Sequence, residues 1–226
     1  MALEEEVRST VINYVLRHLT PRRRAGQKPL EWFEEQFNFV SDEQLKKHVS
    51  EAFYQARFSE KMKVALGLKA GFNNSSIKTQ IILYASIYEA LIDYSLELHK
   101  NRNEVIEMCQ KTEFVHVKGA LAKTTKSIVS ESGSDIELIL CKIKKSQQSL
   151  KEVQFKKRLT TAVAMGIVLE KHQESIQTIY DARNSVHLIK AAASSFTPDQ
   201  KHSTAAFKNL QHFIKNIRNW HATNPI

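Results

Sequence analysis

The sequence predicts an all-α fold, an antiparallel helical bundle with a helical N-terminal extension, on the basis of three observations. Its 226 residues include only six glycines and four prolines, so the signals that end helices are sparse. Several long segments carry apolar side chains three and four positions apart, the spacing of one face of a helix. The segment IILYASIYEALI, residues 81–92, is apolar on nearly every side, which is typical of a helix at the centre of a bundle.

The N-terminal extension is predicted to span residues 1–70 and to be helical, and its role stays open. Residues 2–19 carry apolar side chains at helical spacing, so the chain is expected to begin with an amphipathic helix. A basic loop between Pro21 and Pro29 follows. Pro29 then opens a short helical segment, PLEWFEEQFNFV, because proline is well suited to the first turn of a helix.

The end of this extension carries a second set of helix signals. Ser41 or Asp42 can cap a helix over residues 42–68, because a short side chain with an oxygen accepts hydrogen bonds from the free amides of the first turn. The sequence KAGFNNSS then predicts a turn, with a domain boundary near residues 70–75. Residues 71–226 are expected to form the second domain, which contains the bundle.

The second domain is expected to hold the long helices. Residues 114–130 suit either a short strand or the start of a helix, and SESGSD at 130–135 predicts a turn. Pro198 separates the last two helical segments, with Thr197 or Asp199 as the cap of the final one. The helical segments predicted for this domain are 76–99, 135–196 with a break near 149–160, and 201–220.

Composition and motifs exclude several classes of protein. The longest apolar stretch contains Glu89 and is too short and too polar for a bilayer span. The acidic start MALEEEVRST lacks the features of a signal peptide. Cys109 and Cys141 have no metal-ligand neighbours, so a cytoplasmic protein with reduced thiols is expected. No HExxH, CxxC, Walker or GxGxxG pattern occurs, and neither a metal nor a cofactor is therefore predicted.

The formal net charge of +9 indicates an anionic partner, and nucleic acid is the commonest one. The positive charge is concentrated in three stretches with few acids. Residues 17–28 and 201–226 carry no acid, and residues 118–158 carry ten basic residues against four acidic ones. RNA is the predicted partner. The alternative is a solvated surface with a surplus of lysine and arginine.

The candidate site lies on the helix that contains YDARNSVHLI, residues 180–189. One stripe of this helix is apolar and is expected to face the core; its members are Ile179, Ala182, Val186, Ile189 and Ala193. A second stripe lies about 100° round the helix and is polar; its members are Tyr180, Arg183, His187 and Lys190, with Asn184 beside Arg183. The spacing brings a guanidinium, an imidazole and an ammonium onto one face.

These residue types suit RNA cleavage without a metal ion. The nucleophile is the substrate's own 2′-hydroxyl, so the protein has only to move protons and to stabilise the charge around phosphorus. A histidine suits the first task, and an arginine fork aimed at the non-bridging oxygens suits the second. The alternative is that Arg183 pairs with a carboxylate on a neighbouring helix while His187 is solvated.

Two further features bear on this site. Glu89 stands in an otherwise apolar segment, where an unpaired carboxylate is costly, so it is expected either to orient Arg183 or to lie exposed at an edge of the bundle. Arg218, Asn219 and His221 repeat the same order of residue types. A basic helix terminus is expected there for dipole reasons, so these three are interpreted as structural.

The sequence IYDARNSVHL, with the segment ILYASIYEALIDYSLEL well upstream of it, resembles the HEPN superfamily over roughly residues 72–220. That family comprises all-α domains of toxin–antitoxin, phage-defence and CRISPR systems, many of them metal-independent ribonucleases. Its signature is an arginine, a polar residue such as asparagine, and then a histidine. Arg183, Asn184 and His187 match these roles, and AAFKNLQHFIKNIRNW resembles the family's terminal helix.

The resemblance implies a metal-independent endoribonuclease of toxin or phage-defence type that acts as a homodimer, with an antitoxin or a defence complex as a further partner. The predicted site residues are Arg183, Asn184 and His187 as catalytic groups, and Glu89, Tyr180 and Lys190 in support. Only three residues separate the arginine from the histidine, fewer than in most of the family. The alternative is therefore a non-catalytic HEPN-like module that binds RNA or nucleotide, or a helical adaptor, within a larger complex.

Overall fold

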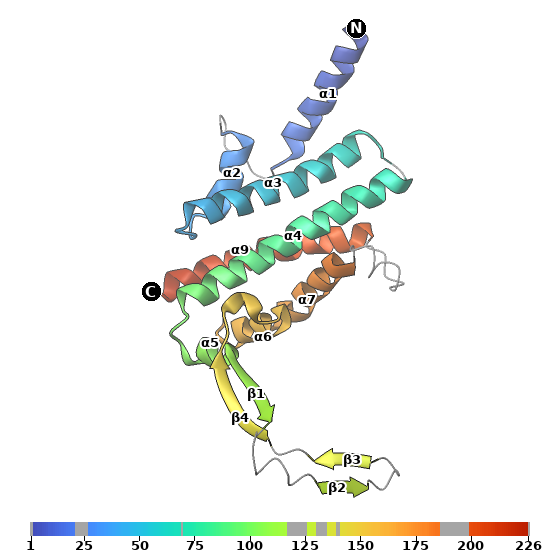
Figure 1. Cartoon of the computed structure of the whole chain (residues 1–226). Coiled ribbons are helices and arrows are strands. Elements are labelled where there is room, and N and C mark those ends of the chain that lie inside the picture. Colours follow the sequence, from blue (N-terminus) through green and yellow to red (C-terminus); the bar gives the residue numbers. More distant parts are fainter. Residues whose placement is uncertain are drawn as a thin grey trace.

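The computed structural model is mostly helical, which confirms the predicted fold class in its coarse form (Figure 1). Two small pairs of strands interrupt the helices. The structure describes residues 2–20, 27–68, 70–116, 126–129, 135–138, 141–185 and 199–225. In this part of the chain, no helix is long and apolar enough to cross a bilayer.

Three helices form the N-terminal part, as the sequence predicts: α1 (Ala2–His18), α2 (Pro29–Gln36) and α3 (Glu43–Ala65). Asp42 is the N-cap of α3, because its side chain accepts a hydrogen bond from the amide of Leu45 at 2.9 Å. Val15 near the C-terminal end of α1 and Leu19 just after it are buried, whereas Val7 nearer the start of the helix is 58% exposed. Figure 1 shows the first turns of α1 leading away from the bundle.

The long helix α4 (Ala70–Leu98) is the central element, as predicted. It contacts α3, α6, α7 and α9, and its fully buried side chains include Tyr84, Tyr88, Leu91 and Ile92. Because α4 begins at Ala70, the chain turns between α3 and α4 earlier than the predicted 70–75. One core cluster joins side chains of α2 and α3 to those of the later helices. The division into two domains stays a prediction.

The last helix, α9 (Gln200–Thr223), runs parallel to α4, although the sequence prediction has antiparallel helices throughout. Contacts advance in the same direction along both helices, since Gln80 bonds Ser203 and Ser95 bonds His221. The two helices are parallel because of the number of times the chain crosses the bundle between them. The chain returns through α7 (Glu170–Ser185), and α9 then reverses it again. Asp199 caps α9, as predicted, by accepting from the amide of His202 at 3.0 Å.

Two short helices and a tight turn complete the bundle: α5 (Asn103–Met108), the 3-10 turn η2 (Leu150–Glu152) and α6 (Phe155–Ala164). The turn from α6 toward α7 contains Gly166, whose φ of 75° lies in the left-handed region that favours glycine. The indole Nε1 of Trp220 donates to the carbonyl of Met165 at 3.0 Å, so α9 holds this turn in place.

The strands are the main departure from the sequence prediction. Two antiparallel pairs form, β1 (Gln110–His116) with β4 (Cys141–Gln147), and β2 (Lys126–Val129) with β3 (Asp135–Leu138). The helix predicted to run on from residue 135 is therefore wrong up to Gln147. In CKIKKSQ the apolar Cys141 and Ile143 alternate with lysine, which is the period of a strand. The strand option for Phe114 and Val115 is confirmed by β1.

Candidate functional site around Arg183

Arg183 lies in the last turns of α7, and its side chain reaches Glu89 at the middle of α4. The guanidinium Nη1 donates to the carboxylate Oε2 of Glu89 at 2.6 Å. The two side chains are 30% and 22% exposed, so the pair lies at the edge of the core. The contact between Glu89 and Arg183 is thus present. It is expected both for an oriented catalytic arginine and for a structural ion pair, so the functional role of Glu89 stays a prediction.

Glu89 is shared with a second arginine that the sequence analysis did not single out. Arg158, on α6, donates from Nη2 to Glu89 Oε1 at 2.9 Å and from Nη1 to Asp93 Oδ2. Its side chain is only 7% exposed. Two arginines and two carboxylates therefore form one continuous network across α4, α6 and α7, which we call the Glu89 cluster. The buried guanidinium of Arg158 is stabilised by the two carboxylates beside it, whereas Glu89, Asp93 and Arg183 remain partly exposed.

Burial and charge act in opposite directions on the carboxyl of Asp93. Its pKa is raised, first because burial disfavours the charged form, while the neighbouring Arg158 guanidinium opposes the shift.

The sequence signal that could have revealed Arg158 is its position among apolar neighbours. It lies on α6 between the buried side chains of Phe155 and Leu159, and an arginine among such neighbours needs a charged partner.

Aromatic stacking holds Tyr180, the first residue of the polar stripe, in place. The ring of Tyr180 stacks on Phe155 with centroids 3.9 Å apart and planes 16° from parallel. The guanidinium carbon of Arg183 lies 5.4 Å from the Tyr180 ring centroid, within the range of a cation–π interaction. Tyr180 and Arg183 therefore share a face, as predicted. The side chain of Asn184 is half-buried and makes no hydrogen bond to another described residue.

The remaining predicted site residues, His187 and Lys190, lie outside the described residues, as do Val186 and Ile189 of the apolar stripe. The part of the site that the structure describes is an arginine held from one side. Its Nη1 is bonded to Glu89, and Nε and Nη2 make no hydrogen bond within the described ranges. A guanidinium fixed by one carboxylate and partly open to solvent can still donate to an oxyanion.

Arg218 and His221 contact a different set of residues from the Glu89 cluster. Arg218 donates from Nη2 to the carbonyl of Gln36 at 2.7 Å, which satisfies a carbonyl at the end of α2. The Nε2 of His221 lies 2.9 Å from Ser95 Oγ, and its ring stacks on Phe39 with centroids 5.4 Å apart. These contacts join α9 to α2 and α4. They agree with the structural interpretation of this second motif.

The imidazole of His221 is expected to stay neutral at pH 7 and to destabilise the fold in acid. Burial, and then the nearby His99, lower its pKa to about 4 from 6.5. The unfolded chain therefore binds one more proton between these values. The free energy of unfolding that depends on neutral His221 is therefore fully present above pH 6.5 and decreases as the pH falls toward 4. Urea unfolding of His221→Gln should lose this part of the pH dependence, whereas His48→Gln, at an exposed site, should keep it. An imidazole signal of His221 that titrates near 6.5 by NMR would contradict this assignment.

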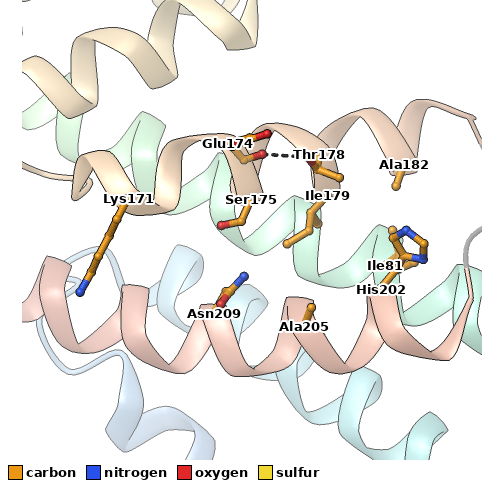
Figure 2. A pocket seen from close by; sticks show the side chains of 10 residues that line it. All are labelled: Ile81, Lys171, Glu174, Ser175, Thr178, Ile179, Ala182, His202, Ala205 and Asn209. Carbon is orange, nitrogen blue, oxygen red and sulfur yellow. Dashed lines mark hydrogen bonds between the residues drawn. The ribbon is translucent and has the colours of Figure 1, made fainter.

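A cavity of about 320 Å³ lies between α4, α7 and α9 (Figure 2). Its floor is apolar, with Ile81, Ile179 and Ala182, and its rim carries Lys171 and Asn209. Arg183 is not among the residues that line it, although it follows Ala182 in the chain. The cavity and the Glu89 cluster thus lie on different sides of α7.

Within the described residues, no group of three or more histidine, cysteine or acidic side chains is placed to hold a metal ion. Cys109 and Cys141 are both free thiols. Known protein families, curated proteins and solved structures were all compared with the chain, and none of them matches it. The HEPN membership that the sequence suggests therefore stays a prediction.

Proposed function

We propose that this protein is a metal-independent endoribonuclease of toxin or phage-defence type, with Arg183, Asn184 and His187 as its catalytic groups. The observation that carries the proposal is the way Arg183 is held. Glu89 fixes its Nη1, Glu89 is itself fixed by Arg158, and the other nitrogens of Arg183 have no partner among the described residues. A catalytic arginine needs such support, because a fork that is already oriented stabilises an oxyanion without reorganising during the reaction.

The proposed reaction needs no group beyond the RNA and the protein. The 2′-oxygen attacks the adjacent phosphorus while a base removes the 2′-hydroxyl proton. The bond from phosphorus to the 5′-oxygen then breaks, and an acid protonates the leaving oxygen. The products are a 2′,3′-cyclic phosphate and a 5′-hydroxyl. His187 serves as base or acid, Arg183 binds the non-bridging oxygens, and Asn184 positions one or both.

A homodimer belongs to this proposal. The base and the acid act on opposite sides of the phosphorus, and one chain offers one such Arg–His pair. A two-fold axis that brings two copies of the stripe together supplies both groups and doubles the positive charge around the substrate. RNA is the proposed substrate, and an antitoxin or defence-complex subunit is the proposed partner.

Cleavage of mixed RNA is expected to persist in excess EDTA and to leave 2′,3′-cyclic phosphate ends or their hydrolysis products. Both results follow from attack by the 2′-hydroxyl, which requires no metal-bound water. End-group analysis by mass spectrometry measures the product. An RNA in which every 2′-hydroxyl is methylated is the control and should stay intact. Cleavage of that RNA, or a strict requirement for added Mg²⁺, would contradict the mechanism.

A second candidate, a non-catalytic module that binds RNA or nucleotide, is favoured by one observation. The 2.6 Å ion pair with Glu89 neutralises part of the charge on Arg183. An arginine balanced in this way is also suited to holding α7 on α4. If so, the protein binds RNA with no turnover, and RNA recovered after incubation is unchanged in length.

A further inference from the structure

The two strands β1 and β4 form an arm that extends from the helices, which we call the β1–β4 ribbon (Figure 1). No third strand pairs with it in the described part of the chain. Two paired strands alone are marginally stable in water, so such an arm gains from a partner. Its exposed apolar side chains give the same indication, since Phe114 is 71% and Ile143 is 63% exposed.

The register of the ribbon separates its side chains onto two faces. Residues directly opposite each other in an antiparallel pair point to the same side. On one face Phe114 lies opposite Ile143, and Lys145 is the next residue of β4 on that face. On the other face Lys142 and Lys144 alternate with these positions. Phe114 thus has Lys145 as an exposed neighbour on its own face, while Lys142 and Lys144 are exposed on the opposite face.

The ribbon carries a clear excess of positive charge. Its fourteen paired residues include four lysines and one acid, Glu113. Lys111 is bound to Glu113 at 2.8 Å. Lys142, Lys144 and Lys145 are exposed and make no ion pair with any other residue that the structure describes. The ribbon therefore carries three exposed lysines outside any of these ion pairs: Lys145 on the face of Phe114, and Lys142 and Lys144 on the other face, where Lys144 lies opposite Glu113.

We propose that the β1–β4 ribbon is a docking surface for single-stranded nucleic acid, with a base stacked on Phe114, a phosphate held by Lys145 on the same face, and further phosphates held by Lys142 and Lys144 where the strand passes round the edge of β4. Charge complementarity identifies the occupant, because a polyanion with exposed ring faces satisfies both the lysines and the phenylalanine. A single strand fits better than a duplex, whose bases are already stacked. A second copy of the ribbon would bring like charges together.

The root of the ribbon is fixed to the helices. The amide of Gln148 donates to the carbonyl of Cys109 at 3.0 Å, and Lys157 Nζ donates to the carbonyl of Met108 at 2.6 Å. Lys157 belongs to α6, the same helix that contributes Phe155 and Arg158 to the surroundings of Arg183. The ribbon is therefore joined to the Glu89 cluster through one helix. The proposal does not depend on cleavage, since it concerns other residues and is tested by binding alone.

The test uses a fluorescent oligouridine of about 12 nucleotides with 2′-O-methyl groups, which presents phosphates and bases but cannot be cleaved by 2′-hydroxyl attack. The full-length variant Lys142→Gln/Lys144→Gln/Lys145→Gln should bind it about tenfold or more weakly in fluorescence anisotropy, with the salt slope lowered by about two. The matched control removes the same charge from exposed positions on α9, Lys201→Gln/Lys208→Gln/Lys215→Gln. Equal losses in both variants would overturn the proposal, because bulk charge would then explain binding.

Phe114 supplies the second arm of the test. Phe114→Ser should weaken binding by roughly tenfold with no change in salt slope, because stacking releases no counterions. Phe114→Tyr keeps the ring and should bind like the unchanged protein. Because the side chain is mostly exposed, neither change removes core packing. If Phe114→Ser leaves oligouridine binding intact but lowers the mass measured by light scattering, the ribbon pairs with a second copy and the proposal is overturned.

Discussion

Replacing Arg183 by alanine is expected to slow RNA cleavage by about 10²–10⁴-fold while leaving the protein folded. The loss is large because the guanidinium would stabilise charge that develops only in the transition state. The fold should survive, because the side chain is 30% exposed and makes one hydrogen bond, to Glu89. Arg183→Lys keeps the charge but not the planar fork, so it should restore only a small part of the rate.

The control for this experiment is Arg218→Ala, which removes an arginine from the second Arg–Asn motif. Arg218 bonds a backbone carbonyl of Gln36 and no member of the Glu89 cluster, so its loss should leave the rate of cleavage unchanged. Thermal melts of both variants show whether the fold is intact.

A site shared between two subunits has one further consequence. Inactive His187→Ala and Arg183→Ala chains, when mixed, should recover part of the activity if each phosphate draws on both subunits. A rate untouched by Arg183→Ala would remove this residue from the mechanism.

Helices were predictable where local signals decide the structure. The apolar periodicity of α4, the cap at Asp42 and the cap at Asp199 are all properties of neighbouring residues. The β1–β4 ribbon was not predictable in this way, because β4 pairs with residues about thirty positions earlier and its lysines also suit a solvated helix. The parallel course of α4 and α9 likewise depends on how many times the chain crosses the bundle between them.

Contacts in the candidate site could be predicted where leaving a charge unpaired would cost much free energy. Glu89 could be paired with Arg183 in advance because a lone carboxylate in an apolar helix is expensive to bury. Arg158 was harder to find, since an arginine at the end of a basic stretch looks solvated in the sequence. Its burial follows from how α6 lies on α4, which no local pattern contains. The position of Arg158 is therefore a tertiary property.

Replacing Arg158 by methionine is expected to lower the free energy of unfolding by about 3–5 kcal/mol, the usual cost of removing one partner from a buried ion pair. Arg158 is nearly buried and bonds both Glu89 and Asp93, so two carboxylates lose their shared cation. Urea unfolding at pH 7 measures the change. Arg102→Met is the matched control. It breaks a single ion pair with Glu104 in which the two side chains are 39% and 38% exposed. Its cost should be far smaller than that of Arg158→Met, because exposed ion pairs contribute little to stability.

The pH dependence of the Arg158→Met variant distinguishes stranded charge from lost packing. The pKa of Asp93 is already raised by burial, and Arg158 opposes that rise. Without the arginine the folded-state pKa moves further up, above the unfolded value. A carboxyl shifted in this direction costs stability while it is ionised, and the cost disappears as the pH falls through the folded-state pKa.

The loss in free energy of unfolding caused by Arg158→Met should therefore be smaller at pH 5 than at pH 8. Asp93→Asn with Glu89→Gln in the same chain should recover much of this deficit at pH 8. A deficit that is equal at both pH values and unchanged by neutralising the two carboxylates would mean that Arg158 stabilises the bundle by filling space between α4 and α6, and not by balancing charge.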